Sequence, residues 1–270
     1  MQYTGSRLWL FVVLALSMCG AARAELILSS APRDSQEKEE AIFQPITALL
    51  SKATGEKVTF RYGDNFLVYQ SEMRKGTYDI VLDGPAFVSW RMAKLQHVPF
   101  IKFPGNLAFS VIAKSDNKKI ETLKDLAGRT ICAFPPPNLA TLTILYEFDN
   151  PARQPLVLES QSFQDVYKGV MAGKCAGGIL QPKLFKDLDK DGKGKVLFTS
   201  KPLPNQAFSA GPRVTAENRA KMTQALLSPE GVAATQKLRE VFKIQALEPA
   251  TVEEYQGLAK LLRDVWGFGL

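Results

Sequence analysis

The chain has 270 residues, 46% of them hydrophobic, and a formal net charge of +7 at pH 7. This length and apolar content allow a sizeable core and one or two domains. The dispersed lysines and arginines argue against nucleic-acid binding, and the single histidine argues against a zinc site and against histidine-based nucleophilic catalysis.

The N-terminal segment has the parts of a secretory signal peptide. Arg7 supplies a positive start, Leu8–Met18 is apolar, and Ala22–Ala24 is a small-x-small cleavage site. The apolar run is shorter than the ~20 residues of a membrane span, and no later stretch is long enough. Cys19 leaves a lipoprotein alternative, which the preceding methionine fits poorly. We therefore expect cleavage after Ala24 and a periplasmic mature chain without a transmembrane segment. Its net charge would be +5, since the signal carries two arginines and no acid (+7 − 2).

Two cysteines remain after cleavage, Cys132 and Cys175. In an oxidising compartment an even number of cysteines is compatible with one disulfide. Both fall on predicted core strands of one region, which adjacent parallel strands can bring within bonding reach. A pair of buried free thiols is the alternative.

Strands and helices alternate in the first half of the mature chain. The pattern predicts a strand at Leu26–Ser29, a helix from Asp34 to Ala53, a strand at Lys57–Tyr62, a helix at Phe66–Lys75 and a strand at Tyr78–Leu82. Alternation at these lengths predicts right-handed βαβ units and a mainly parallel sheet. The fold class is therefore α/β.

The same plan then recurs. The second series comprises strands at Thr130–Phe134, Leu156–Glu159 and Ala176–Leu180 and helices at Leu139–Phe148 and Phe163–Ala172. Gly76 precedes Pro85 by nine residues, and Gly173 precedes Pro182 by the same distance. We expect two topologically similar halves.

Two apolar stretches, Leu107–Lys114 and Gln206–Gly211, are predicted to cross between the halves. The chain after them is helical, and we expect these helices to return to the first half. Lobe 1 would then comprise residues 25–110 and 209–270, and lobe 2 residues 111–208. A two-segment connection makes a hinge and closure around a ligand possible.

The strongest candidate site is the loop that leads into the helix at Leu139–Phe148. Open α/β sheets hold ligands at the carboxyl ends of their strands. Asn138 is predicted to cap this helix, so that the N–H groups of Leu139, Ala140 and Thr141 face a cleft at the positive end of the helix dipole. An ordinary helix cap without a ligand is the alternative.

Other polar residues follow the remaining strands. Arg33 is able to hold an oxyanion in two hydrogen bonds, but a solvated pair with Asp34 or Glu37 is the favoured interpretation. The aromatic residues Phe66 and Phe87 fit a plain core equally well. The predicted ligand-binding residues are Asn65, Asp83, Ser110, Asn138, Leu139, Ala140, Thr141 and Gln181.

The chain contains no sequence pattern that indicates a cofactor or a metal. The acidic run from Asp187 to Gly192 resembles the start of a calcium loop, but the twelfth position is Phe198 where a bidentate glutamate is required. No phosphate-binding glycine loop, dinucleotide fingerprint or nucleophile elbow occurs. We expect no cofactor, no metal and no enzymatic activity.

The order and spacing of several stretches resemble the periplasmic phosphate/phosphite/phosphonate solute-binding proteins of ABC transporters. The resemblance runs from about Leu26 to Leu262 and is carried by IFQPITALLSKATGEKVTF, RKGTYDIVLDGPAFV, LAFSVIAKSD, ETLKDLAGRTICAF, DVYKGVMAGKCAGGI, VLFTSKPLPN and EEYQGLAKLL. It implies a two-lobed type 2 periplasmic-binding-protein fold with the ligand between the lobes, a monomer, and an ABC permease as partner.

The departures from the family pattern fall at the ligand site. The Ser/Thr-rich S-T-S-G-type loop of the family is replaced by Pro136–Thr141, and Phe66 and Phe87 stand where the family often has tyrosine. A histidine common in the family is replaced within Gln161–Gln164. Each lost donor to a buried oxyanion would cost roughly 1–3 kcal/mol.

We therefore expect an exported protein that captures a small anionic or polar ligand for an ABC-type importer. A phosphonate- or phosphate-like oxyanion is the leading ligand by resemblance, and another small organic acid fits the more apolar rims. A sensor that uses the same fold to signal to a membrane kinase or a redox partner is the alternative.

Overall fold

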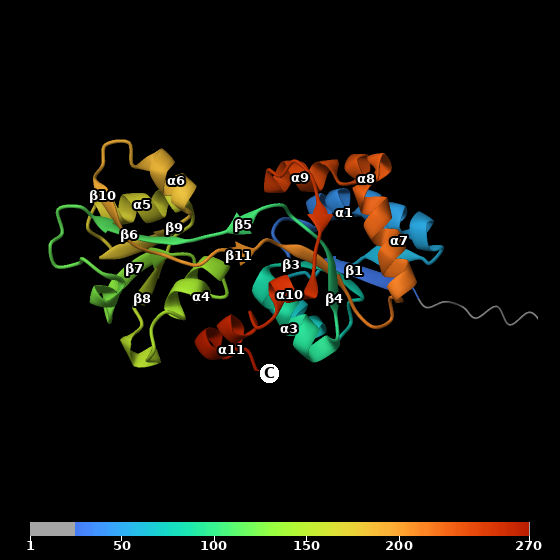
Figure 1. Cartoon of the computed structure of the whole chain (residues 1–270), viewed down its shortest axis with the longest axis horizontal. Coiled ribbons are helices and arrows are strands. Elements are labelled where there is room, and N and C mark those ends of the chain that lie inside the picture. Colours follow the sequence, from blue (N-terminus) through green and yellow to red (C-terminus); the bar gives the residue numbers. More distant parts are fainter. Residues whose placement is uncertain (1–24, 270) are drawn as a thin grey trace, which may run out of the picture.

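A computed structural model describes residues 25–269, so the predicted signal peptide lies outside the described residues. The described chain folds into two α/β lobes that lie side by side (Figure 1). The sheet of lobe 1 has the strand order β13-β4-β12-β3-β1-β2. Its strands are β1 (Leu26–Ser30), β2 (Val58–Phe60), β3 (Ile80–Asp83), β4 (Val98–Lys102), β12 (Ala207–Ala210) and β13 (Glu248–Pro249).

Helices cover this sheet and continue to the C-terminus. They are α1 (Gln36–Thr54), α2 (Phe66–Arg74), α3 (Pro85–Leu95), α7 (Ala216–Leu227), α8 (Pro229–Ala234), α9 (Gln236–Phe242), α10 (Val252–Tyr255) and α11 (Lys260–Trp266). The longest, α1, buries Phe43, Ile46 and Leu50 in a core shared with β1 and ends where Gly55 takes a left-handed φ of 71°. Within residues 25–269, no helix combines the length and apolar character needed to cross a membrane.

The sheet of lobe 2 has the strand order β10-β6-β9-β7-β8. Its strands are β6 (Ser110–Lys114), β7 (Thr130–Ala133), β8 (Leu156–Glu159), β9 (Gly177–Leu180) and β10 (Gly194–Thr199). The accompanying helices are α4 (Leu139–Leu145), α5 (Phe163–Met171) and α6 (Pro182–Leu188), with 3-10 turns η1 (Leu123–Leu126) and η2 (Pro151–Arg153).

The two sheets follow one plan, which confirms the predicted internal repeat. The parallel strands β3-β1-β2 of lobe 1 correspond to β9-β7-β8 of lobe 2. Each set is extended by an antiparallel strand that arrives from the other lobe, β12 on β3 and β6 on β9. Gly76 and Gly173 turn the chain before β3 and β9 with left-handed φ angles of 71° and 72°.

The connections between the lobes are shorter than the sequence predicts. The crossing segments are β5 (Asn106–Leu107) and β11 (Leu203–Pro204), which pair antiparallel. The predicted crossings at Leu107–Lys114 and Gln206–Gly211 instead belong mainly to the sheets, as β6 and β12. Pro204 limits the pairing of β11 with β5, because it lies in β11 and has no N–H to donate.

The disulfide between Cys132 and Cys175 is present, with a Cα–Cα distance of 5.6 Å. Cys132 lies in β7 and Cys175 comes just before β9, its parallel neighbour. Helix α5 passes so close that a Cβ on Gly169 would lie 2.6 Å from the Cys132 Sγ atom. The bridge therefore joins β7 to the segment that leads into β9, beneath a tightly packed helix.

The single histidine of the chain, His97, is buried between the end of α3 and β4, with 4% of its surface exposed. Its Nδ1 atom lies 3.2 Å from the Ser209 Oγ atom, and the Gly211 backbone lies against the ring. Burial, aided by the positive charge of Arg91, lowers the pKa of His97 to about 3. The ring is therefore neutral in the folded protein.

We expect the free energy of unfolding to fall as the pH is lowered from 7 to 4. An unfolded histidine titrates near pH ~6.5. Between the two pKa values the unfolded state binds the extra proton, and His97 then destabilises the fold by about 3 kcal/mol at pH 4. Because this is the only histidine among the 270 residues of the chain, NMR of untagged protein follows its ring unambiguously. A folded-state ring that titrates between pH 5 and 7 would contradict this expectation.

Candidate functional site

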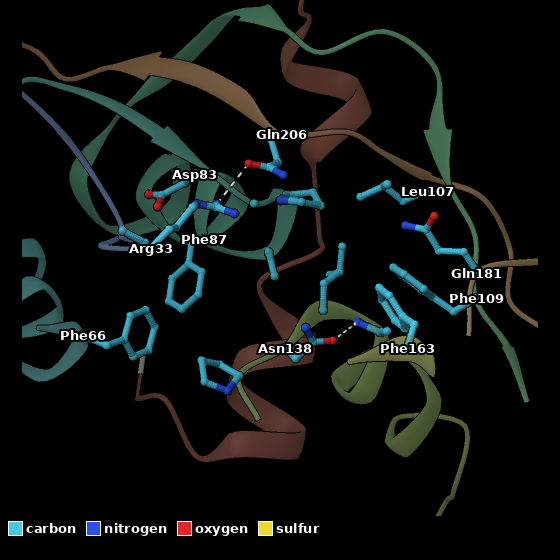
Figure 2. Close-up of a pocket in the computed structure, with 17 residues that line it drawn as sticks. Arg33, Phe66, Asp83, Phe87, Leu107, Phe109, Asn138, Phe163, Gln181 and Gln206 are labelled. Carbon is cyan, nitrogen blue, oxygen red and sulfur yellow. Dashed lines mark hydrogen bonds between the residues drawn. The ribbon is translucent and has the colours of Figure 1, made fainter. Parts of the chain in front are cut away.

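A cavity of about 390 Å³ lies between the two lobes (Figure 2). This volume falls within the ~300–1,000 Å³ typical of ligand pockets. Lobe 1 contributes the segments after β1 and β3, and lobe 2 contributes the starts of α4, α5 and α6. The lining residues are Ala31, Arg33, Phe66, Asp83, Gly84, Pro85, Ala86, Phe87, Leu107, Phe109, Pro137, Asn138, Leu139, Ala140, Phe163, Gln181 and Gln206.

Four phenylalanines from both lobes form much of the cavity wall. Phe66 and Phe87 come from lobe 1 and meet edge to face with ring centroids 6.0 Å apart. Phe109 and Phe163 come from lobe 2 and lie across the cavity from Phe87 (Figure 2). The apolar surface is thus shared between the two lobes.

Arg33 and Gln206 form the polar end of the cavity (Figure 2). The Arg33 Nη2 atom donates to the Gln206 Oε1 atom at 3.0 Å, and the guanidinium lies 4.9 Å from the centre of the Phe242 ring. Within the described chain, no carboxylate lies within 4.0 Å of this guanidinium. The Arg33 side chain is exposed to solvent, but protein atoms surround it on several sides. These atoms partly desolvate the guanidinium and so lower the pKa of Arg33.

Arg33 is exposed, as the favoured surface interpretation expects, but the predicted ion pair with Asp34 or Glu37 is not formed. Asp34 pairs instead with Lys38 one helical turn on, at 2.9 Å. That pairing leaves the Arg33 side chain to extend over the carboxyl end of the sheet. Arg33 supplies a positive charge without a carboxylate partner at one end of the cavity.

Asp83 lies at the edge of the cavity, but its carboxylate oxygens accept hydrogen bonds from buried side chains. Its Oδ1 atom accepts from the Tyr69 hydroxyl at 2.7 Å, and its Oδ2 atom accepts from Arg91 Nε at 2.6 Å. Arg91 is 0% exposed and Asp83 is 1% exposed. Burial, and then the Asp83 carboxylate, raise the pKa of the Tyr69 hydroxyl, so it remains a donor. Arg91 neutralises the Asp83 charge beneath the cavity floor.

The loop before α4 uses its polar groups locally. The Asn138 Oδ1 atom accepts from the Ala140 N–H at 3.0 Å, as a helix cap does. The Thr141 hydroxyl is buried and donates to the Phe134 carbonyl at 2.5 Å. The peptide bond between Pro136 and Pro137 is cis. Backbone and apolar surface are therefore what this loop chiefly presents to the cavity.

The structure brings together five of the eight predicted site residues, namely Asp83, Asn138, Leu139, Ala140 and Gln181. The other three lie outside the cavity lining. Asn65 accepts from the N–H groups of Leu67 and Val68 at the start of α2, and the Ser110 hydroxyl lies 2.8 Å from the Thr199 hydroxyl. Whether any of the eight binds a ligand stays a prediction.

Sequence reasoning did not include several residues that line the cavity. Phe109 and Phe163 lie at a strand start and a helix start, positions where an aromatic residue usually indicates core packing. Phe163 follows the loop at the carboxyl end of β8, which was an available signal, whereas Phe109 directly precedes β6 and has no such signal. No local pattern distinguishes a phenylalanine that lines a cavity from one that fills a core.

Comparison with known proteins gives the family. Residues 28–255 match the family described as "ABC transporter, phosphonate, periplasmic substrate-binding protein". This chain belongs to that family. Its members are substrate-binding proteins of ABC transporters rather than enzymes, and the family implies a permease partner and a small ligand.

Individual relatives of this substrate-binding protein are distant. The phosphate-import protein PhnD of Mycolicibacterium smegmatis is 28% identical over 119 residues, which is 41% of this chain and 37% of that protein. The chain thus matches little more than a third of that relative.

Solved structures show the same fold. XAC2383 from Xanthomonas citri, bound to ATP, has a TM-score of 0.68 and 14% identity, with 90% of this chain and 98% of that chain covered. PhnD1 from Prochlorococcus marinus, in complex with methylphosphonate, has a TM-score of 0.61 and 13% identity at the same coverage. The two-lobed type 2 periplasmic-binding-protein fold is confirmed.

Proposed function

We propose that this protein captures a small oxyanion between its lobes and delivers it to the permease of an ABC importer. The observation that carries the proposal is the Arg33 guanidinium, which has no carboxylate partner within the described chain and lies at the polar end of the interlobe cavity. The planar guanidinium of arginine can donate two parallel hydrogen bonds to two oxygens of a carboxylate or a phosphonate, which no other side chain does as well. The proposed ligand is therefore an anion.

The first turn of α3 supports this assignment. Ala86 and Phe87 line the cavity, and their N–H groups belong to the first turn of a helix, which leaves them without partners inside the helix. Gly84 precedes the helix and supplies no side-chain cap. An 11-residue helix directs the positive end of its dipole toward this point, which favours a negative ligand group.

The names of relatives are consistent with the same ligand chemistry. One relative is a phosphate-import protein, and one solved structure of the fold holds methylphosphonate. Export to the periplasm would follow from the predicted signal peptide at residues 1–24. The proposed role requires binding and release without a chemical step.

The binding test is isothermal titration calorimetry of the mature protein with phosphonates and carboxylates. We expect Arg33→Gln to weaken the binding of the best anion by about 10- to 100-fold, since a hydrogen bond to a charged group contributes about 1.5–3 kcal/mol. Lys38→Gln is the matched control, because it removes one nearby positive charge that pairs with Asp34 outside the cavity. Equal affinities of the two variants, or no binding of any anion by the wild type, would overturn the proposal.

A further inference from the structure

The interlobe cavity is lined by few polar side chains, and most of its wall is apolar. Among the described residues that line it there is no serine, threonine, tyrosine, histidine or lysine. Asp83 uses both carboxylate oxygens within the protein and has no N–H to offer, which leaves Arg33, Gln206, Gln181 and the amide nitrogen of Asn138 as the side-chain donors. Together with the free N–H groups at the start of α3, these donors suit one anionic group, but inorganic phosphate needs donors on all four of its oxygens, including those that would face the apolar wall.

The rest of the wall is apolar and comes from both lobes. Phe66 and Phe87 face Phe109, Phe163 and Leu107 across the space next to Arg33 (Figure 2). A cavity of about 390 Å³ is larger than a phosphate or methylphosphonate ion needs. The surplus space is bounded by rings that would contact an apolar ligand group on opposite sides.

These rings are held in place from behind by other aromatic residues. Phe87 meets Phe268 edge to face at 5.8 Å, and Phe66 lies 6.3 Å from Trp266, which stacks on Phe268 at 5.4 Å. In lobe 2, Phe163 meets Phe134 edge to face at 4.9 Å. Because the wall is already packed in position, little conformational freedom is lost when a ligand enters.

We propose that the substrate is an organic oxyanion with an aromatic or bulky alkyl body rather than inorganic phosphate or a one-carbon phosphonate. This inference rests on the proposed function and narrows its substrate class. The anionic group meets Arg33 and Gln206, and the apolar body fills the space between the phenylalanines of the two lobes.

The test compares phenylphosphonate, benzoate, methylphosphonate and inorganic phosphate by calorimetry with the mature protein. Burying a phenyl ring should make phenylphosphonate bind about 10- to 100-fold more tightly than methylphosphonate. Benzyl alcohol, which keeps the ring without the charge, should bind far more weakly than benzoate. Binding of benzoate but not of the phosphonates would still support an aromatic oxyanion.

The two proposals fail in different ways. If methylphosphonate or phosphate binds as tightly as the aromatic anions, the inference is overturned while the proposed function stands. If benzyl alcohol equals benzoate, or if none of the four anions binds, the oxyanion function itself is overturned and this inference with it.

A variant locates the apolar contact. Phe163→Ala removes one half-buried ring and should weaken phenylphosphonate by about 3- to 10-fold, with less than about a 2-fold effect on methylphosphonate. Phe148→Ala is the matched control, because Phe148 is also half-buried in lobe 2 but lies outside this cavity. Thermal melts confirm that both variants fold. Equal losses for the two ligands, or for the two variants, would overturn the placement of the ring.

Discussion

Asp83→Asn is expected to lower the free energy of unfolding by about 3–5 kcal/mol, the cost of breaking a buried ion pair from one side. The guanidinium of Arg91 is 0% exposed and donates to the Asp83 carboxylate at 2.6 Å. Its Nη1 atom already has no hydrogen-bond partner among the described residues. Removing the carboxylate charge would leave a buried cation whose hydrogen-bond partners, the Tyr69 hydroxyl and the new amide oxygen, are both neutral.

Urea unfolding followed by circular dichroism measures this loss. The double variant Asp83→Leu/Arg91→Met removes both charges, and we expect it to be more stable than Asp83→Asn because no unpaired charge stays buried. A loss below about 1 kcal/mol for Asp83→Asn, or a double variant less stable than the single one, would show that the pair is not the buried network described.

The second large effect is expected from the disulfide. Replacing Cys132 and Cys175 together with alanine should lower the free energy of unfolding by roughly 4 kcal/mol, since the bridge closes a loop of 43 residues and restricts the unfolded chain. Lobe 2 contains both ends of this loop, so its sheet should unfold first.

Urea unfolding of the oxidised wild type, the reduced wild type and the double alanine variant measures the effect of the bridge. The reduced wild type is the control for lost side-chain packing, because it keeps both sulfur atoms. Midpoints that coincide for the oxidised and reduced proteins would contradict a stabilising bridge.

Much of the fold was predictable because its signals are local. Strand–helix alternation gave the α/β class, and the matched spacing of Gly76 and Gly173 from their prolines gave the repeat, which the shared strand order confirms. The predicted crossing segments correspond mainly to β6 and β12, which belong to the two sheets. Their apolar sequences do not reveal this, because it depends on their pairing with β9 and β3.

The candidate site was less predictable, because the direction of a side chain depends on tertiary contacts. Thr141 was predicted to face the cleft, yet its hydroxyl bonds to the Phe134 carbonyl inside the loop. Arg33 has acidic neighbours in sequence, but Asp34 forms its ion pair with Lys38. Arg33 instead donates a hydrogen bond to Gln206, which lies on the segment that returns to lobe 1. A residue 173 positions away cannot be read from the local sequence.

A crystal structure of the mature protein with phenylphosphonate tests the central claim most directly. We expect the phosphonate oxygens within hydrogen-bond distance of the Arg33 guanidinium and the phenyl ring between Phe87 of lobe 1 and Phe163 of lobe 2. A ligand bound outside the interlobe cavity, or one whose phosphonate group points away from Arg33, would contradict the account.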